Sequence, residues 1–330
     1  MAKENPHKTR VRFPIGAKLV LIISILVLVS LGTVTVLVSA ISTQDVRRTA
    51  EDNNLTVNQR AGSQAESAFT ALQAAVSLYL ETLSRDRGIR DRDSELDSYF
   101  FDRNQNIAAI AVSAGGAGWT LIPNEQFFLS NEINAGKAES YITSNIALPV
   151  PADGKIRFFN ASPDFELPLI AMVFTRRQGS PAPSAGPEAV SPGSETIAVL
   201  FSPDELAESF GTGANSSFMI NEAGDVLLHA DSDLVLGGAN FSDLPIVETM
   251  QNEGDNNRQV SFTHEGIDYF GAYYRIPQMG AAVFTTIPHS VVFEAVRSVT
   301  RQNLFLTAAV LFIAILFIWL FSKTISTPVG

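Results

Sequence analysis

The sequence predicts an α+β protein in which two apolar helices flank a domain made of one long helix and two antiparallel sheets. Three observations support this fold class. Charged residues are distributed unevenly along the chain, two long runs carry no charge, and two groups of short strand-like stretches with glycine and asparagine turns lie between those runs. With 330 residues, the chain is long enough for two domains that each have a core.

The net charge of −11 hides a separation of charge along the chain. Residues 1–18 and the tail after Phe321 together carry +5, whereas residues 42–303 contain 17 Lys and Arg against 33 Asp and Glu, which gives −16. A uniformly acidic soluble protein does not sort its charges in this way. The acidic middle segment also argues against a nucleic-acid partner, because it would repel the phosphates.

Two apolar runs predict transmembrane helices, and therefore a lipid bilayer as a partner. Residues 19–41 contain no charged side chain over 23 positions, and residues 304–321 contain none over 18. About 20 apolar residues match the hydrocarbon core of a bilayer, because a helix rises about 1.5 Å per residue. We expect the first helix to cross the membrane over 19–41 and the second over 303–321.

Basic residues set the expected orientation of these helices. Positive charge favours the cytoplasmic side, so residues 1–18 and Lys323 are expected inside and residues 42–303 outside. The alternative for the first run is a cleaved signal peptide, with Val38-Ser39-Ala40 as its cleavage site. The run is longer than the usual apolar core of about 7–15 residues, which favours a membrane-spanning helix.

Residues 42–83 predict a long helix, because they contain no proline and only one glycine, Gly62. Apolar residues recur there at intervals of three and four positions, as on one face of a helix. We expect this stripe to pack on the helix's own domain, and a parallel dimer seam is the functional alternative. The stripe consists of Ala65, Phe69, Leu72, Val76, Tyr79 and Leu83.

The strand-like stretches form two groups joined by a short helix. Residues 84–103 mix charges of both signs and are expected to be a solvated helix end and a loop. Residues 178–195, rich in Pro, Gly and Ser, predict a disordered loop. Ser202-Pro203 predicts the start of the joining helix, with Ser202 as its N-cap. The expected strands are 107–112, 119–122, 155–160, 167–175 and 196–201, and then 217–220, 226–230, 260–264, 267–276 and 281–287.

Residues with catalytic or metal-binding spacing are not found. The chain has no cysteine, which excludes disulfides, thiolate zinc sites and a thiol nucleophile. His264-Glu265 lacks the second histidine of a zinc helix, and Asp231-Ser-Asp233 lacks the rest of a calcium loop. We therefore expect no enzyme, no metal site and no cofactor within these residues. His229 and Asp231 are interpreted as structural turn residues, because no third metal ligand is spaced nearby.

Three segments of the second group carry a resemblance to a known family: Phe218-Met-Ile-Asn221-Glu-Ala-Gly224-Asp225 with the following Val-Leu-Leu-His229, Tyr269-Phe-Gly-Ala-Tyr273-Tyr274, and Val283-Phe-Thr-Thr-Ile-Pro288. With these segments, the layout resembles bacterial transmembrane receptors with an extracytoplasmic double Cache sensor, which has two PAS-like modules. The resemblance implies an inner-membrane receptor that binds a small molecule and forms a parallel homodimer. The family's amino-acid pattern is not matched, because Tyr99 and Arg103 lack the Trp-Tyr pair that should follow.

After the second apolar run, Ile325-Ser-Thr-Pro328-Val329 resembles the opening of a HAMP linker. The resemblance implies that residues 322–330 begin such a linker and that an output domain belongs to the receptor after residue 330. We expect a nucleotide cyclase, as in receptor-type adenylate and guanylate cyclases. A chemotaxis signalling domain or a sensor kinase is the alternative, and a membrane-anchored enzyme or adhesin is the alternative from another class.

In such receptors the membrane-distal module usually carries the ligand. An aromatic wall with a few polar side chains suits a small molecule, and six residues of that module have these properties. The candidate ligand-binding residues are Trp119, Tyr141, Arg157, Asn160, Asp164 and Arg176. The alternative places Trp119 in the core and the two arginines on the surface.

These predictions divide the chain as follows. The expected parts are a cytoplasmic N-terminus (1–18), the first transmembrane helix (19–41), a stalk helix (42–90), a membrane-distal Cache module (91–209), a membrane-proximal Cache module (210–302), the second transmembrane helix (303–321) and the start of a HAMP linker (322–330).

Overall fold

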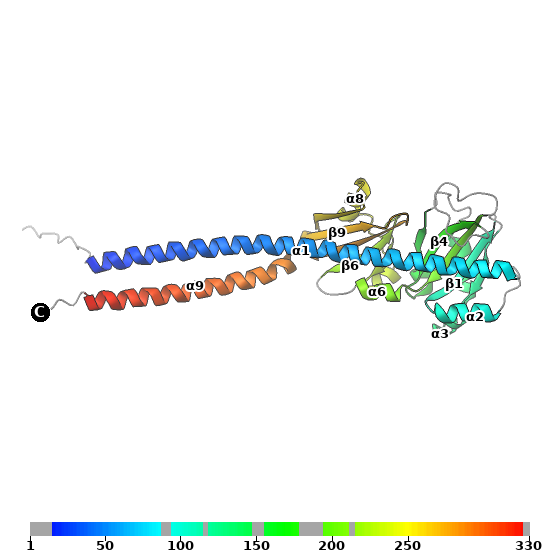
Figure 1. Ribbon diagram of the computed structural model, residues 1–330, viewed down its shortest axis with the longest axis horizontal. Helices are drawn as coiled ribbons and strands as arrows, with labels where there is room; N and C mark the ends of the chain where they lie inside the picture. Colours follow the sequence, from blue (N-terminus) through cyan, green and yellow to red (C-terminus); the bar gives the residue numbers. More distant parts are fainter. Residues whose placement is uncertain are drawn as a thin grey trace, which may run out of the picture. The chain divides into compact units, whose positions relative to one another are not determined.

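A computed structural model describes residues 15–86, 94–114, 118–146, 155–177, 194–210 and 215–325. The chain divides into two compact units (Figure 1). One unit comprises residues 1–49 and 290–330, and the other comprises residues 50–289.

The first unit consists of the two apolar helical segments. They belong to helix α1 (Ile15–Asp86) and helix α9 (His289–Ile325), which are both long and apolar enough to cross a membrane, and no described residue of their most apolar windows is buried. Two hydroxyl pairs join the segments. Thr35 Oγ1 lies 3.2 Å from Thr307 Oγ1, and Ser39 Oγ lies 3.3 Å from Thr300 Oγ1. Such hydroxyl contacts are common between helices in apolar surroundings.

The second unit contains two five-stranded antiparallel sheets. The first sheet has the order β2-β1-β5-β4-β3 and the second has the order β7-β6-β10-β9-β8. Both sheets therefore follow one topology, and the predicted α+β fold with two antiparallel sheets is confirmed. The strands of the first sheet are β1 (Ile107–Ala114), β2 (Thr120–Pro123), β3 (Arg157–Asn160), β4 (Ile170–Arg177) and β5 (Ser194–Phe201). Those of the second are β6 (Ser216–Asn221), β7 (Val226–His229), β8 (Asn257–His264), β9 (Ile267–Arg275) and β10 (Ala281–Pro288).

Helix α1 covers one face of both sheets, which we call the inner face (Figure 1). One continuous apolar core joins its stripe to β1, β4 and β5 of the first sheet and to β6 and β10 of the second. The predicted stripe is confirmed as the packing face, because five of its residues are buried and Leu72 packs against the same core. The Phe69 ring illustrates the packing, since it lies 4.7 Å from the Phe158 ring and 6.0 Å from the Phe201 ring.

Short helices cover the opposite, outer face of each sheet. On the first sheet these are α3 (Glu125–Ser130), α4 (Gly136–Asn145) and α5 (Ser162–Phe165), which enclose a second apolar core. On the second sheet they are α7 (Ser232–Leu236) and α8 (Pro245–Asn252), which enclose a third. The chain passes between the sheets through α6 (Asp204–Phe210).

Two local predictions were wrong. Residues 94–103 form helix α2 (Ser94–Arg103) and not a loop, because Phe100 stacks on Tyr79 at 4.2 Å and the Tyr79 hydroxyl donates to Asp97 at 2.6 Å. Ser202 does not cap α6. The carbonyl of Pro203 accepts the first helical hydrogen bonds, so Pro203 occupies the cap position instead. The predicted loop 178–195 lies almost wholly outside the described residues.

Buried polar side chains fix α1 against the second sheet. The Asn54 amide donates to the Thr285 carbonyl at 3.0 Å, and the Asn58 amide donates to the Val283 carbonyl at 3.0 Å and to Thr285 Oγ1 at 3.2 Å. Both asparagines are fully buried, so these bonds form in a low dielectric and specify one register between helix and strand β10.

Gly62 allows the closest approach of α1 to the second sheet. A Cβ atom at this position would overlap the ring of Tyr274 on β9. The helix therefore needs a residue without a side chain here, although glycine in a helix interior costs about 0.5–1 kcal/mol relative to alanine. The Tyr274 hydroxyl also donates to Glu66 on α1, at 3.0 Å.

Candidate ligand-binding site

The outer face of the first sheet has a floor of small apolar side chains. Strand register places Val173, Ala198 and Ala111 side by side on β4, β5 and β1. Each of the three is fully buried or nearly so beneath the outer helices. Because side chains alternate between faces along a strand, every second residue of these strands shares this face.

A row of hydroxyl side chains lies two positions further along the same strands, again on the outer face. Thr175 pairs with Thr196, and Thr196 pairs with Ser113. Ser113 is 2% exposed, and its Oγ atom has no hydrogen-bond partner in the described part of the chain. A buried hydroxyl without a partner is costly, so Ser113 Oγ is an unsatisfied polar atom on this face.

Trp119 and Arg157 lie at opposite edges of this face, Trp119 beside β2 and Arg157 on β3 next to Val173 of the apolar floor. Trp119 directly precedes β2, where Thr120 pairs with Val112, and its half-buried ring packs against the outer core. Arg157 is half-buried on β3 and pairs with Val173, which places it on the outer face. Two of the six predicted residues therefore share one face with the hydroxyl row.

The side chains on this face are of the types that bind small molecules. A guanidinium recognises carboxylate or phosphate oxygens, hydroxyls accept and donate hydrogen bonds, and an indole supplies an apolar wall. The described residues contain no group of three or more His, Cys, Asp or Glu side chains that could hold a metal ion. Together these properties favour a small polar ligand.

Tyr141, Asn160 and Asp164 lie elsewhere, at the end of the first sheet that meets the second. The Asn160 amide donates to the Val235 carbonyl of α7 at 2.8 Å, which ties β3 to the second sheet's outer layer. Asp164 is exposed on α5. Buried Tyr141 on α4 lies with its hydroxyl 3.5 Å from the Asn160 carbonyl.

The surroundings of Tyr141 keep its phenol protonated. Burial raises the pKa of Tyr141 far above its ordinary value, and the nearby charges of Asp164 and Asp225 raise it further. The hydroxyl therefore acts as a hydrogen-bond donor at every physiological pH.

Arg176, the sixth predicted residue, lies on the opposite, inner face. It is fully buried, and its Nε and Nη2 atoms donate to Glu195 Oε2 at 3.0 and 2.8 Å. Its Nη1 atom donates to the Ser77 carbonyl of α1 at 2.9 Å. The structure therefore separates Arg176 from the outer face and joins it to the packing between sheet and helix.

Sequence reasoning did not find the hydroxyl row, although a signal existed. Each of the three hydroxyl residues, Thr175, Thr196 and Ser113, lies near a strand end at a position whose side chain points to the outer face. Only the pairing of β1 with β5 and of β5 with β4 brings them together. This pairing joins segments that are distant in sequence.

His229 and Asp231 form a turn, as predicted. Asp231 caps α7 by accepting the Asp233 N–H at 3.1 Å, and His229 Nδ1 accepts the Asp231 N–H at 2.8 Å. Burial lowers the pKa of His229, which keeps its ring neutral and preserves Nδ1 as an acceptor.

Comparison with known protein families and with curated proteins finds no match for this chain. Among solved structures, the extracellular domain of soHK1S-Z6, described as a histidine kinase, is similar with a TM-score of 0.50 and 14% identity. The match covers 77% of this chain and 99% of that domain. This likeness shows that the chain shares the fold of that extracellular domain.

Two chemoreceptor domains are similar at lower scores. The sensory domain of the Campylobacter jejuni chemoreceptor Tlp3 with isoleucine bound has a TM-score of 0.45 and 12% identity, covering 76% of this chain and 97% of that one. The ligand-binding domain of the Pseudomonas fluorescens chemoreceptor CtaA with L-isoleucine has a TM-score of 0.45 and 8% identity, covering 77% and 98%.

Proposed function

We propose that this chain is the sensory input part of a bacterial transmembrane receptor and that it binds a small molecule outside the cytoplasm. The observation that carries the proposal is the outer face of the first sheet, which holds Trp119 at one edge, Arg157 at the other, and a hydroxyl row whose buried Ser113 Oγ has no hydrogen-bond partner among the described residues. The fold of an extracellular sensory domain is consistent with this role.

Thermal unfolding of the purified chain with a metabolite library tests the binding function. A saturable rise in Tm with one compound is expected, because a ligand that binds only the folded state stabilises it. Arg157→Ala should then weaken the affinity without lowering the Tm of the free protein. Arg103→Ala is the matched control, since Arg103 is exposed on α2 and lies over the Tyr99 ring.

Two outcomes would contradict this assignment. Unchanged affinity in Arg157→Ala would remove the outer face as the site. No stabilisation by any compound would favour a membrane anchor or adhesin over a sensor.

We further propose that residues 19–41 and 303–321 cross the inner membrane, with residues 42–303 outside. The charge separation supports this orientation, because basic residues favour the cytoplasmic side. Alkaline phosphatase is active only outside the cytoplasm, so a fusion after residue 289 should be active and one after residue 325 inactive. Two active fusions would contradict the two-pass topology.

In the proposed mechanism, the ligand shifts the population between two arrangements of the sensory unit. Strand β10 continues directly into α9, so a displacement of the second sheet would be passed to the second apolar helix. The ligand can bias this equilibrium only by its difference in affinity for the two arrangements.

A parallel homodimer belongs to the proposal. The apolar stripe of α1 is buried within its own domain, so a dimer seam along the stalk would use the opposite side, where Leu78 is 60% exposed. Because the chain has no cysteine, Leu78→Cys introduces a single thiol. Oxidation of membranes carrying this variant should give a covalent dimer if the stalks are paired, whereas a persistent monomer would contradict the seam.

We propose three alternatives for the cytoplasmic signalling domain that this receptor controls. The layout resembles that of receptor-type cyclases, which favours a nucleotide cyclase, whereas the likeness to soHK1S-Z6 supports a histidine kinase, and a chemotaxis signalling domain is the third form. A chimera of residues 1–330 with the cytoplasmic part of a kinase and a transcriptional reporter tests whether this input controls a kinase. Reporter output that does not change with the ligand would count against it.

A further inference from the structure

A cleft of about 460 Å³ lies where the two sheets meet. We call it the junction cleft. One wall is the segment that leads into β3, and the other is the turn between β9 and β10. Its volume falls within the range of small-molecule sites, roughly 300–1,000 Å³. The residues that line the cleft include Lys155, Glu222, Met250, Arg275, Gln278 and Gly280.

Backbone hydrogen bonds between the two walls hold the cleft in shape. The Ile156 N–H donates to the Gln278 carbonyl at 3.2 Å, and the Gly280 N–H donates to the Ile156 carbonyl at 2.8 Å. Gln278 occupies a tight turn, closed by a 3.2 Å bond from the Met279 N–H to the Ile276 carbonyl, and has a φ of 59°. A glutamine in this left-handed conformation is strained, and such strain concentrates at functional sites.

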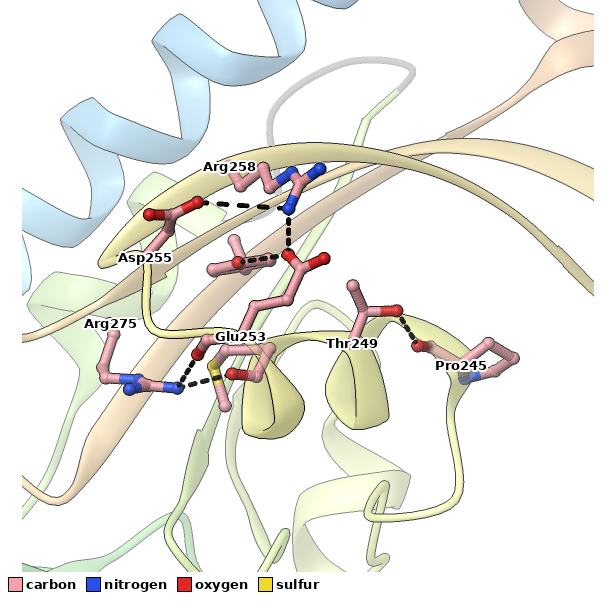
Figure 2. Close-up of polar contacts among 8 residues, drawn as sticks. Pro245, Thr249, Glu253, Asp255, Arg258 and Arg275 are labelled. Carbon is pink, nitrogen blue, oxygen red and sulfur yellow. Dashed lines mark hydrogen bonds and ion pairs between the residues drawn. The ribbon is translucent and has the colours of Figure 1, made fainter.

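Arg275 supplies a cation that no carboxylate of the described residues neutralises. Its half-buried guanidinium donates through Nη2 to the carbonyls of Met250 and Glu253 at the end of α8, and within the described ranges it forms no ion pair (Figure 2). Partial burial of an unpaired charge costs free energy, and an anion at the guanidinium would offset this cost.

Two carboxylates that follow α8 are engaged by other groups. Glu253 pairs with Arg258 and accepts a hydrogen bond from the Tyr273 hydroxyl at 3.3 Å (Figure 2). Asp255 lies 4.0 Å from the same Arg258. Arg275 therefore contacts only the backbone of this cluster, while Arg258 takes its carboxylates.

The remaining charges leave the lining positive. Lys155 pairs with Glu222 at 3.0 Å, so the described residues that line the cleft include two cations and one anion. Gly280 lets Glu222 lie against the backbone, because a Cβ there would come within 3.2 Å of the Glu222 side chain. The side chains of Met250, Ile276 and Met279 add an apolar part to the lining.

We propose that the junction cleft is a second small-molecule site and that it binds a small carboxylate, whose anionic group is held by Arg275 and attracted by Lys155. This site is distinct from the outer face of the first sheet and does not depend on binding there. A carboxylate held by Arg275 and Lys155 would bridge the second sheet and the segment that leads into β3, so it would stabilise the arrangement in which the two are joined and thereby act on the strand that precedes α9.

The test uses the full chain in lipid nanodiscs and four sodium salts, namely acetate, lactate, succinate and citrate, against sodium chloride at equal ionic strength. At least one carboxylate is expected to raise the Tm saturably. Arg275→Gln removes the charge but keeps an amide that can donate to the end of α8. It should weaken the apparent affinity at least about tenfold, as the loss of a charged hydrogen bond does.

Arg103→Gln is the matched control, because Arg103 is exposed on α2, lies over the Tyr99 ring and does not line the cleft. It should leave the carboxylate response unchanged. The proposal is overturned if none of the four salts shifts the Tm, or if Arg275→Gln responds like the unmodified chain. It is also overturned if Arg157→Ala and not Arg275→Gln abolishes the response, which would assign the carboxylate to the outer face.

Discussion

Replacement of Arg176 by alanine tests whether this residue packs the domain or binds a ligand. The guanidinium is fully buried and holds Glu195, which is 2% exposed, through two hydrogen bonds to one carboxylate oxygen. In Arg176→Ala the carboxylate would stay buried without its cation, and the Ser77 carbonyl would lose its donor. Both consequences destabilise the unit formed by residues 50–289.

The expected loss of stability follows from the burial of the ion pair between Arg176 and Glu195. Removal of one partner of a buried ion pair costs about 3–5 kcal/mol, because the remaining charge is left uncompensated. In a domain of about 150–250 residues, 1 kcal/mol shifts Tm by about 2–4 °C. The expected loss in Arg176→Ala is therefore about 6–20 °C.

Thermal unfolding followed by circular dichroism measures this loss. The double variant Arg176→Leu with Glu195→Leu removes both charges and fills similar volume, so it should recover most of the stability. Arg157→Ala, at a half-buried position, should change Tm by far less. A decrease in Tm of less than about 2 °C in Arg176→Ala would refute the packing role. A double variant that is no more stable than Arg176→Ala would also refute it.

Three further expectations use the same Tm measurement. Gly62→Ala should lower Tm although alanine is the better helix former, whereas Gly32→Ala, with no atom within 4 Å of the new methyl, should leave it unchanged or raise it; equal effects would contradict the close approach. The lowered pKa of His229 means that the unfolded chain binds the proton more tightly, so stability should fall as pH drops below the ordinary value of 6.5. His229→Asn should remove that part of the pH dependence, and an unchanged pH profile would count against it. Asn58→Asp should cost at least about 2 kcal/mol by facing a carbonyl with an acceptor, whereas the same change at exposed Asn53 should be neutral; a stable Asn58→Asp would argue against the buried network.

The helix and strand patterns could be predicted because they are local. The stripe of α1 repeats every three or four residues, and the strands alternate or run apolar between clear turn residues. Helix α2 could not be predicted in this way. Its charges suggest a loop, and its stability depends on Phe100 and Phe101 packing against Tyr79, a contact that only the tertiary structure creates.

The candidate site was less accessible to sequence reasoning, because the face of a strand residue depends on parity and partner. Arg157 and Arg176 are both strand arginines, yet one lies on the outer face and the other on the inner face. Nothing local distinguishes them. The uncompensated charge of Arg275 was equally hidden, since Arg258 competes for the same carboxylates and only the structure shows which arginine obtains them.

The strand orders of the two sheets have a mechanical consequence. In each sheet the last strand in sequence, β5 or β10, is the central one, with hydrogen-bonded neighbours on both sides. The chain therefore leaves each sheet from its middle, into α6 after the first and into α9 after the second. A central strand cannot shift without straining the hydrogen-bond ladders on both of its sides. Any displacement that reaches the next helix is therefore a displacement of the whole sheet, and not of one edge strand. Because both sheets have this order, the chain contains two rigid connections from a sheet to the helix that follows it, one from β5 to α6 and one from β10 to α9.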